Sequence, residues 1–284
     1  MNYIEHKGLS YSRIKSLTHI GDRIDSKGMS IGSCVDLMLT DSDYLDKIHV
    51  TDLDELTPQQ EKFINEVHRL SEEPDDITYL QAFTNLKIKR GKLEDLVTTL
   101  RNTNYFEYLK QRSLKDKIIL STDDFNRALF AVNKIKLSRY YWYFTKGILQ
   151  PEYYTDFSKI KPDIVIEDDD SIEPIDLKTM EGYVANFPGD FIRFGYNIQS
   201  RYYTRVLQEL YPDKVIKPFK FLVVSTTKND DVLEFIDDTD PTEVDLVIDK
   251  AIEMHSYCVD NSLEVNRIAY FKHKYDSIPL SELL

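Results

Sequence analysis

The residues in this sequence best suited to chemistry are two carboxylates and a lysine, Asp163, Asp176 and Lys178. Asp176 and Lys178 are two positions apart, so on a β-strand their side chains share one face while Leu177 points to the other. Mg²⁺ takes carboxylate oxygens as ligands and lowers the pKa of a bound water, and a nearby lysine can orient that water or neutralise charge on a phosphate. The three residues therefore suit a metal-dependent phosphodiesterase. The alternative is a solvated surface ion pair, which contributes little to stability.

A hairpin of two short strands is expected to position these side chains. The β-branched run Ile164–Ile166 follows Asp163, the segment Glu167–Ser171 has the composition of a turn, and Ile172–Lys178 is expected to return as the second strand. Further strands are expected at Glu152–Phe157, at Phe219–Ser225 and, at a sheet edge, at Val232–Ile236.

Helices are expected before and after this sheet region, from apolar residues at helical spacing and from capping residues. They span residues 10–18, 30–39, 58–70, 91–101, 122–137 and 243–257. We therefore predict an α/β (α+β) fold with a mixed central sheet flanked by helices and a helical elaboration in the N-terminal half. Residues 1–284 are expected to form one domain, in which 51–145 is an all-helical insertion packed on the core and 150–258 supplies the catalytic sheet and helices.

Two helices outside the hairpin carry polar residues that suit the same site. Gln199 and Tyr203 are four positions apart, so they lie on one helix face, about twenty residues after Lys178. Asp36 follows Gly32 by one helical turn, and the glycine would leave room for a substrate or a cation. Each has a simpler alternative, since Tyr203 would also suit a half-buried position and Asp36 a solvent-facing one.

The order of these segments resembles the PD-(D/E)xK nuclease superfamily. Its pattern is Pro162-Asp163, a spacer, and Asp176-x-Lys178, here followed by Thr179. Three flanking segments are similar to its phage-type exonuclease branch, which comprises the exonuclease VIII-like proteins and their relatives lambda exonuclease and the RecB nuclease domain. These segments are Gly8–Lys15, Gly28–Thr40 and Gly195–Tyr203.

The resemblance implies a restriction-endonuclease-like core and a set of site residues. The implied catalytic residues are Asp163, Asp176, Lys178, Gln199 and Tyr203, the metal ligands are Asp36, Asp163 and Asp176, and the substrate-binding residues are Ser10, Ser12, Arg193 and Arg201. Relatives commonly have a metal-binding histidine where this chain has Asp36. An aspartate oxygen suits Mg²⁺ or Mn²⁺ at least as well as imidazole does.

The activity that the resemblance implies is hydrolysis of linear double-stranded DNA from an end, with two Mg²⁺ or Mn²⁺ ions and 5′-phosphate products. Proteins of this branch act in phage-type recombination or replication, form closed rings, and feed a single-strand-annealing recombinase. Two alternatives remain open. The chain could be a structure-specific or single-strand nuclease of DNA repair, or a non-catalytic binding protein on a nuclease fold.

Composition limits the class of protein. The 284 residues are 42% hydrophobic, which is enough to bury a sizeable core. Cys34 and Cys258 are too few for the four-thiolate iron–sulfur cluster of some relatives. No apolar run approaches the roughly 18 residues of a membrane span, and no signal peptide begins the chain. We expect a cytoplasmic protein, in the host cell's cytoplasm if it is phage-encoded.

The net charge of −13 does not exclude DNA as a partner, because affinity depends on local neutralisation of phosphates. Residues 229–249 contain nine acidic side chains and no lysine or arginine, whereas Lys87–Lys92 and Lys134–Arg139 are basic. The basic segments are more simply explained as solvated helix faces. The aromatic run Tyr140–Phe144 would suit base stacking, but core packing is the commoner role.

Overall fold

The computed structural model describes residues 8–18, 26–51, 57–71, 73–88, 92–102 and 117–274. The chain divides into two compact units, one made of Met1–Ser42 and Asn126–Leu284, the other of Asp43–Phe125. The second unit is shorter than the insertion expected at 51–145, because most of the helix over 122–137 belongs to the first unit.

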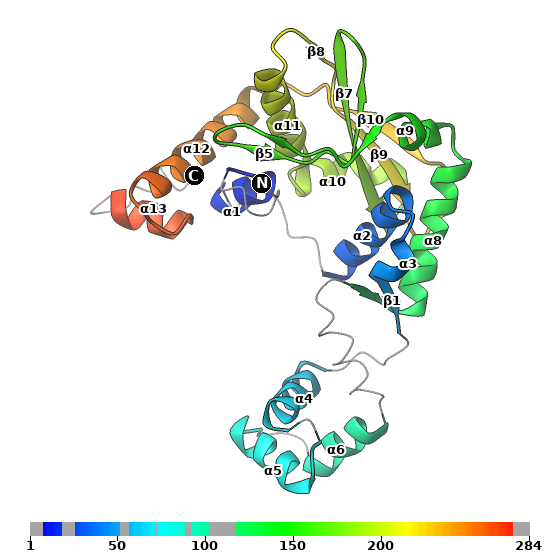
Figure 1. The fold of residues 1–284 in the computed structure, drawn as a ribbon, viewed down its shortest axis with the longest axis vertical. Helices are drawn as coiled ribbons and strands as arrows, with labels where there is room; N and C mark the ends of the chain where they lie inside the picture. The colour runs from blue at the N-terminus through cyan, green and yellow to red at the C-terminus, as the bar shows by residue number, and fades with distance from the viewer. Residues whose placement is uncertain are drawn as a thin grey trace. The chain divides into compact units, whose positions relative to one another are not determined.

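A mixed sheet forms the centre of the first unit, with its strands in the order β10-β9-β7-β6-β3 and with β8 beside β7 (Figure 1). The strands are β3 (Ile148–Leu149), β6 (Ile164–Glu167), β7 (Ser171–Met180), β8 (Val215–Ile216), β9 (Lys220–Ser225) and β10 (Leu233–Ile236). Strands β6 and β7 are antiparallel, with Ile164 opposite Ile175, whereas β7 and β9 are parallel, with Asp176 opposite Phe221. The predicted hairpin and the predicted mixed sheet are confirmed.

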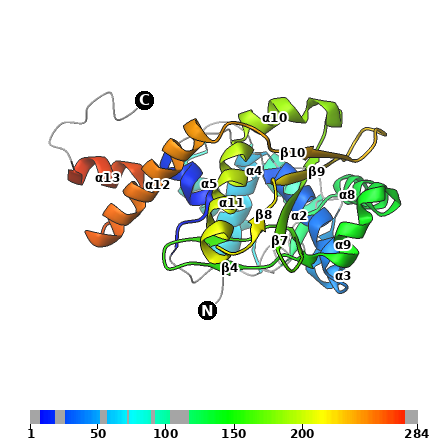
Figure 2. The ribbon, with the colours of Figure 1, turned by 90° about the horizontal axis from the view of Figure 1, so that it is seen from above.

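Helices flank this sheet on both sides, as Figures 1 and 2 show. They are α10 (Phe187–Arg193) and α11 (Tyr196–Leu210) on one side, and α2 (Ser26–Thr40), α8 (Thr122–Leu137) and α9 (Trp142–Lys146) on the other. The rings of Phe187 and Tyr196 lie 5.6 and 5.9 Å from that of Phe221, so α10 and α11 cover the face that carries Asp176.

Two short 3-10 helices and an aromatic run complete this core. The helices are η1 (Arg139–Tyr141) and η2 (Val184–Asn186). Tyr140 and Tyr143 are buried, while Trp142 is 45% exposed. Core packing therefore accounts for most of the aromatic run. None of the helices in the described ranges is long and apolar enough to span a membrane.

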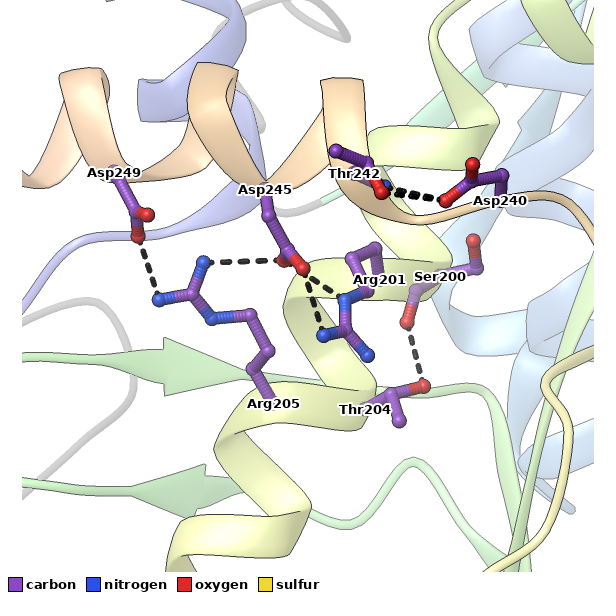
Figure 3. A network of polar contacts seen from close by, with 8 residues as sticks. All are labelled: Ser200, Arg201, Thr204, Arg205, Asp240, Thr242, Asp245 and Asp249. Carbon is purple, nitrogen blue, oxygen red and sulfur yellow. Dashed lines mark hydrogen bonds and ion pairs between the residues drawn. The ribbon is translucent and has the colours of Figure 1, made fainter.

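Helix α12 packs against α11 through a network of charged side chains (Figure 3). Arg201 donates two hydrogen bonds to Asp245, each 2.8 Å long, and Arg205 reaches both Asp245 at 3.3 Å and Asp249 at 2.7 Å. The helices of this region are α1 (Tyr11–Thr18), α12 (Thr242–Asp260) and α13 (Arg267–Lys274). The acidic segment predicted from sequence is therefore partly neutralised by arginines of α11.

The second unit has a hydrophobic cluster of its own, formed by side chains that include Phe63, Tyr79 and Leu100. Its elements are α3 (Tyr44–Lys47), β1 (Ile48–Val50), α4 (Pro58–Leu70), α5 (Asp76–Asn85), α6 (Leu93–Asn102) and β2 (Ile118–Leu120). The expectation that this region is all-helical was wrong, because the β-branched run before Ser121 forms β2 and pairs in parallel with β1.

A strand that the sequence predicted before the hairpin is shorter than expected. Of the strand expected at Glu152–Phe157, only β4 (Tyr153–Tyr154) forms, and it pairs with β5 (Lys159–Ile160) in a small sheet apart from the central one. A bend separates β4 from β5, where the backbone N–H of Thr155 donates to the carbonyl of Ser158. The short turn makes β4 fold back on β5 instead of joining the central sheet.

Candidate active site

The hairpin of β6 and β7 brings Asp163 next to Asp176 and Lys178. Asp163 lies immediately before β6, and its Oδ2 accepts a 2.7 Å hydrogen bond from the backbone N–H of Leu177. Leu177 stands between Asp176 and Lys178, so the hairpin register itself ties the first carboxylate to the Asp-x-Lys segment. Since the connecting turn is short, this neighbourhood follows from local structure.

Gln199 on α11 completes a closed set of contacts with Asp176 and Lys178. Its Nε2 donates to Asp176 Oδ1 at 2.6 Å, and its Oε1 accepts from Lys178 Nζ at 3.0 Å. Lys178 Nζ also lies 2.5 Å from Asp176 Oδ2. Asp176 is only 3% exposed, so these contacts replace most of its hydration.

The Lys178 ammonium group is held as a cation. It lies 4.4 Å from the centre of the Tyr196 ring, close enough for a cation–π contact. Burial by itself lowers the pKa of Lys178, but Asp176 and other neighbours raise it by more, so the pKa lies above that of an ordinary lysine. Lys178 is therefore suited to neutralising negative charge and to donating hydrogen bonds, and not to removing a proton.

Asp36 on α2 joins the two hairpin aspartates in a crowded group of carboxylates. Burial, and next the charge of Asp176, raise the pKa of Asp36 to about 6 even though nearby lysines lower it. Burial, then Asp176 and Asp36, raise the pKa of Asp163 well above its usual value. The charge of Asp176 thus opposes ionisation of both Asp36 and Asp163, and Asp36 Oδ1 is buried with no hydrogen-bond partner.

These features can be tested for their fit to a divalent cation. Within the described ranges, no three or more His, Cys, Asp or Glu side chains are arranged as ligands of one metal ion. Mg²⁺, however, commonly takes one or two protein carboxylates and keeps several waters. The oxygen chemistry, the mutual repulsion and the unpartnered Asp36 Oδ1 fit a cation that retains much of its water shell.

A cavity of about 540 Å³ opens beside Lys178. Its lining includes Gly32, Arg127, Lys178, Thr179, Arg193 and Tyr196. A Cβ atom on Gly32 would lie 3.1 Å from Thr179 Oγ1, which is tighter than ordinary contact. The glycine expected to make room for a substrate or cation therefore also lets α2 approach β7 closely.

Several residues predicted for the site lie elsewhere. Tyr203 is 6% exposed and packs edge-to-face against Phe219, 5.9 Å between ring centres, in the hydrophobic core. Ser10 accepts a 3.4 Å hydrogen bond from the backbone N–H of Arg13 at the start of α1, with Ser12 Oγ 3.1 Å from its own Oγ. Among the substrate-binding candidates Arg193 lines the cavity, and Arg201 is paired with Asp245.

Sequence reasoning missed side chains that hold the start of α11 in place. Tyr11 OH donates to the carbonyls of Phe194 and Gly195, at 3.0 and 3.1 Å, and Lys15 Nζ donates to the first of them at 2.9 Å. Gly195 has a φ of 71°, a left-handed conformation that glycine adopts without strain. This corner sets Tyr196 over Lys178. The spacing of Tyr11 and Lys15, four positions on one helix face, was the available signal.

Gln150 was also missed, and it contacts two of the aspartates. Its side-chain amide donates to Asp36 Oδ2, and its backbone N–H donates to the carbonyl of Asp163 at 2.8 Å. It lies between β3 and β4, outside the hairpin and outside every segment of the resemblance. A lone glutamine before Pro151 gives no sequence signal of such a role.

Comparison with known proteins yields a similarity of fold. No protein-family model matches the chain, and no curated protein matches it. A solved crystal structure from Eubacterium rectale, named "Putative exonuclease", is similar with a TM-score of 0.50 and 12% sequence identity. The similarity covers 92% of this chain and 84% of that one. At this identity the likeness shows the fold, a mixed central sheet flanked by helices.

Proposed function

We propose that this chain is a metal-dependent nuclease that hydrolyses phosphodiester bonds in DNA. The observation that carries the proposal is the group in which the half-buried Asp36 and Asp163 crowd against the buried Asp176 beside the cationic Lys178. Carboxylates with raised pKa values, such as Asp36 and Asp163, are common at catalytic sites, where the chemistry depends on shifted pKa values. The fold shared with the protein named "Putative exonuclease" supports the proposal at the level of architecture.

The proposed chemistry divides the work among the site residues. Asp36, Asp163 and Asp176 would hold Mg²⁺ or Mn²⁺, with two ions expected, and the metal would polarise the phosphate and acidify a bound water. Lys178 would neutralise the charge that develops on the phosphate oxygens. Gln199 donates to the Asp176 carboxylate and accepts from the Lys178 ammonium, so it holds their direct ion pair in one geometry.

The finer proposal is an exonuclease that degrades linear double-stranded DNA from an end, in phage-type recombination or replication. The sequence segments that resemble the phage-type branch support it, as does the name "Putative exonuclease" given to the structure of similar fold. The cavity beside Lys178 also carries two arginines, Arg127 and Arg193, in a chain of net charge −13. Glu181, the ion-pair partner of Arg127, and Asp190 line the same cavity, so three cationic side chains stand against two carboxylates there. This small excess of positive charge is the local feature that would favour a phosphate. A ring-shaped homo-oligomer and an annealing recombinase partner belong to this proposal.

The test uses end-labelled linear duplex DNA, single-stranded DNA and closed circular DNA, each with Mg²⁺ or Mn²⁺. We expect the wild type to digest linear DNA and spare circles, and Asp176→Ala and Lys178→Ala to be inactive. Asp169→Ala is the matched control, because Asp169 is an exposed carboxylate in the turn of the same hairpin. Cutting of circles or of single strands would replace the end-dependent activity with the repair-type alternative. Intact DNA with the wild type and both metals would refute nuclease activity.

A further inference from the structure

Gln150 has an unusual backbone conformation at a position that joins two parts of the site. Its φ is 49°, in the left-handed region that residues other than glycine seldom occupy. It also precedes Pro151, and the residue before a proline is normally extended. Conformations of this kind persist only where the surrounding structure holds them, and they concentrate at functional sites.

Two hydrogen bonds hold Gln150. Its backbone N–H donates to the carbonyl of Asp163 at 2.8 Å, and its Nε2 donates to Oδ2 of Asp36, 114 positions away in the chain. A carboxylate only accepts hydrogen bonds from an amide, so the NH₂ group and not the carbonyl must face Asp36. A single residue, through its side chain and its backbone N–H, therefore links the α2 carboxylate to the residue that precedes the hairpin's first strand.

The contact leaves the two oxygens of Asp36 in different states. Oδ2 is engaged by Gln150, while Oδ1 is buried and has no hydrogen-bond partner. Leaving a buried carboxylate oxygen unpaired is costly, so a fold would keep it only if something else binds there. Holding one oxygen prevents the carboxylate from rotating to satisfy the other by itself.

We propose that Gln150 is a positioning residue, which orients Asp36 to bind a divalent cation and ties it to Asp163. This inference rests on the proposed function, because it takes Asp36 to be a metal ligand. The left-handed backbone is retained because it directs the main-chain N–H and the side-chain amide to their two partners at once. Residues that hydrogen-bond metal-ligating carboxylates typically contribute about 10- to 100-fold in metal affinity.

The test compares Gln150→Gly, Gln150→Ala and the control Gln208→Ala, which removes an exposed glutamine from α11. Glycine tolerates the left-handed φ and lacks the amide, so it separates strain from positioning. By calorimetric titration without DNA, we expect both Gln150 variants to bind Mn²⁺ about 10- to 100-fold more weakly than wild type. We expect the melting temperature of Gln150→Gly to equal or exceed that of wild type, and that of Gln150→Ala to fall below it.

The two measurements, Mn²⁺ affinity and melting temperature, together separate a positioning role of Gln150 from a purely structural one. Weaker Mn²⁺ binding in a Gln150→Gly protein of undiminished stability would support positioning, since a purely structural residue gives the opposite pair of results. Unchanged Mn²⁺ affinity in that variant would overturn the inference and leave the nuclease proposal intact. Absence of Mn²⁺ binding by the wild type would instead overturn the metal site, and this inference with it. Gln208→Ala should match the wild type in both measurements.

Discussion

Two polar clusters contact α11, and they differ in how their charges are balanced. On one side, Arg201 and Arg205 face Asp245 and Asp249 of α12, two cations against two anions (Figure 3). On the other, Gln199 reaches a group in which three aspartates crowd around Lys178. The first cluster has the composition of a structural contact, and the second is short of positive charge.

The shifts in pKa run in opposite directions in the two clusters. The hydrogen bonds from Arg201 hold the pKa of Asp245 below its usual range, so its ionised form is favoured by folding. Burial and Asp176 raise the pKa of Asp36 to about 6, so its ionised form is opposed by folding. A balanced cluster stabilises the fold, whereas an unbalanced one costs stability until a cation binds.

The largest effect is expected from Lys178→Met, which makes the imbalance worse. The rate of DNA digestion should fall about 100- to 1,000-fold, because charge on the phosphate loses its stabiliser. The metal-free protein should also lose about 3 kcal/mol of unfolding free energy, since Asp176 stays buried without its cation. Initial rates and urea unfolding measure the two effects. Lys146→Met, a change at an exposed lysine of α9, is the control, and full activity in Lys178→Met would contradict the assignment.

Added Mn²⁺ should stabilise the unbalanced cluster and leave the balanced one unaffected. At 100 times its dissociation constant, a cation bound only to the folded state adds about 2.7 kcal/mol. Thermal denaturation with and without Mn²⁺ should therefore show a rise for the wild type and for Arg205→Ala, but none for Asp176→Ala. Equal protection of Asp176→Ala would place the cation elsewhere.

The pH dependence of stability should have opposite signs at Asp36 and Asp245. The pKa of Asp36 is about 6 in the folded protein, above the ordinary value of about 4. The folded state then holds more protons between these values, and stability falls as pH rises through that window. Asp36→Asn removes this loss, so its advantage over metal-free wild type should grow from about pH 4 to about pH 6. Urea unfolding across this range measures it.

Asp245 provides the contrast in the same experiment. Its pKa is lowered by folding, so its contribution is present above the ordinary value of about 4 and is lost as pH falls. Asp245→Asn should therefore be less stable than wild type at neutral pH, and the difference should shrink in acid. Parallel curves for the two variants would mean that the clusters do not differ as described.

The smallest effect is expected from Arg205→Ala. Its partners Asp245 and Asp249 are 28% and 58% exposed, so solvent screens the ion pairs. We expect a loss of about 0.5–1 kcal/mol in urea unfolding, reduced further in 1 M salt, with the rate of DNA digestion per folded molecule unchanged. A large loss of activity would show that this side of α11 belongs to the site.

Much of the fold and half of the site were predictable because they depend on neighbours in the chain. Helix α4 was expected at Pro58–Leu70, the bounds observed, and its start is fixed by a capping box between Thr57 and Gln60. The hairpin was expected from alternation and turn composition, and its register places Asp163 beside Leu177. The shared face of Asp176 and Lys178 follows from the period of a strand.

Other parts could not be predicted because their partners are distant in sequence. The periodicity of α11 places Gln199 and Tyr203 on one face, yet the first reaches the hairpin and the second packs on Phe219 in the core. Arg201 was expected to bind substrate, but α12 supplies Asp245 as its partner, 44 positions away.

The sequence by itself determined many of the elements, the caps of helices such as α4, and which side chains share a strand or helix face, because these depend on residues within a few positions. Only the tertiary structure decided that Asp36 meets Asp163 and Asp176, and that Gln150 holds one oxygen of Asp36 while leaving the other unpaired. The raised pKa of Asp36 likewise comes from burial and from a charge on another element. Burial and long-range charge arise only when distant segments pack, so no local pattern could have revealed them.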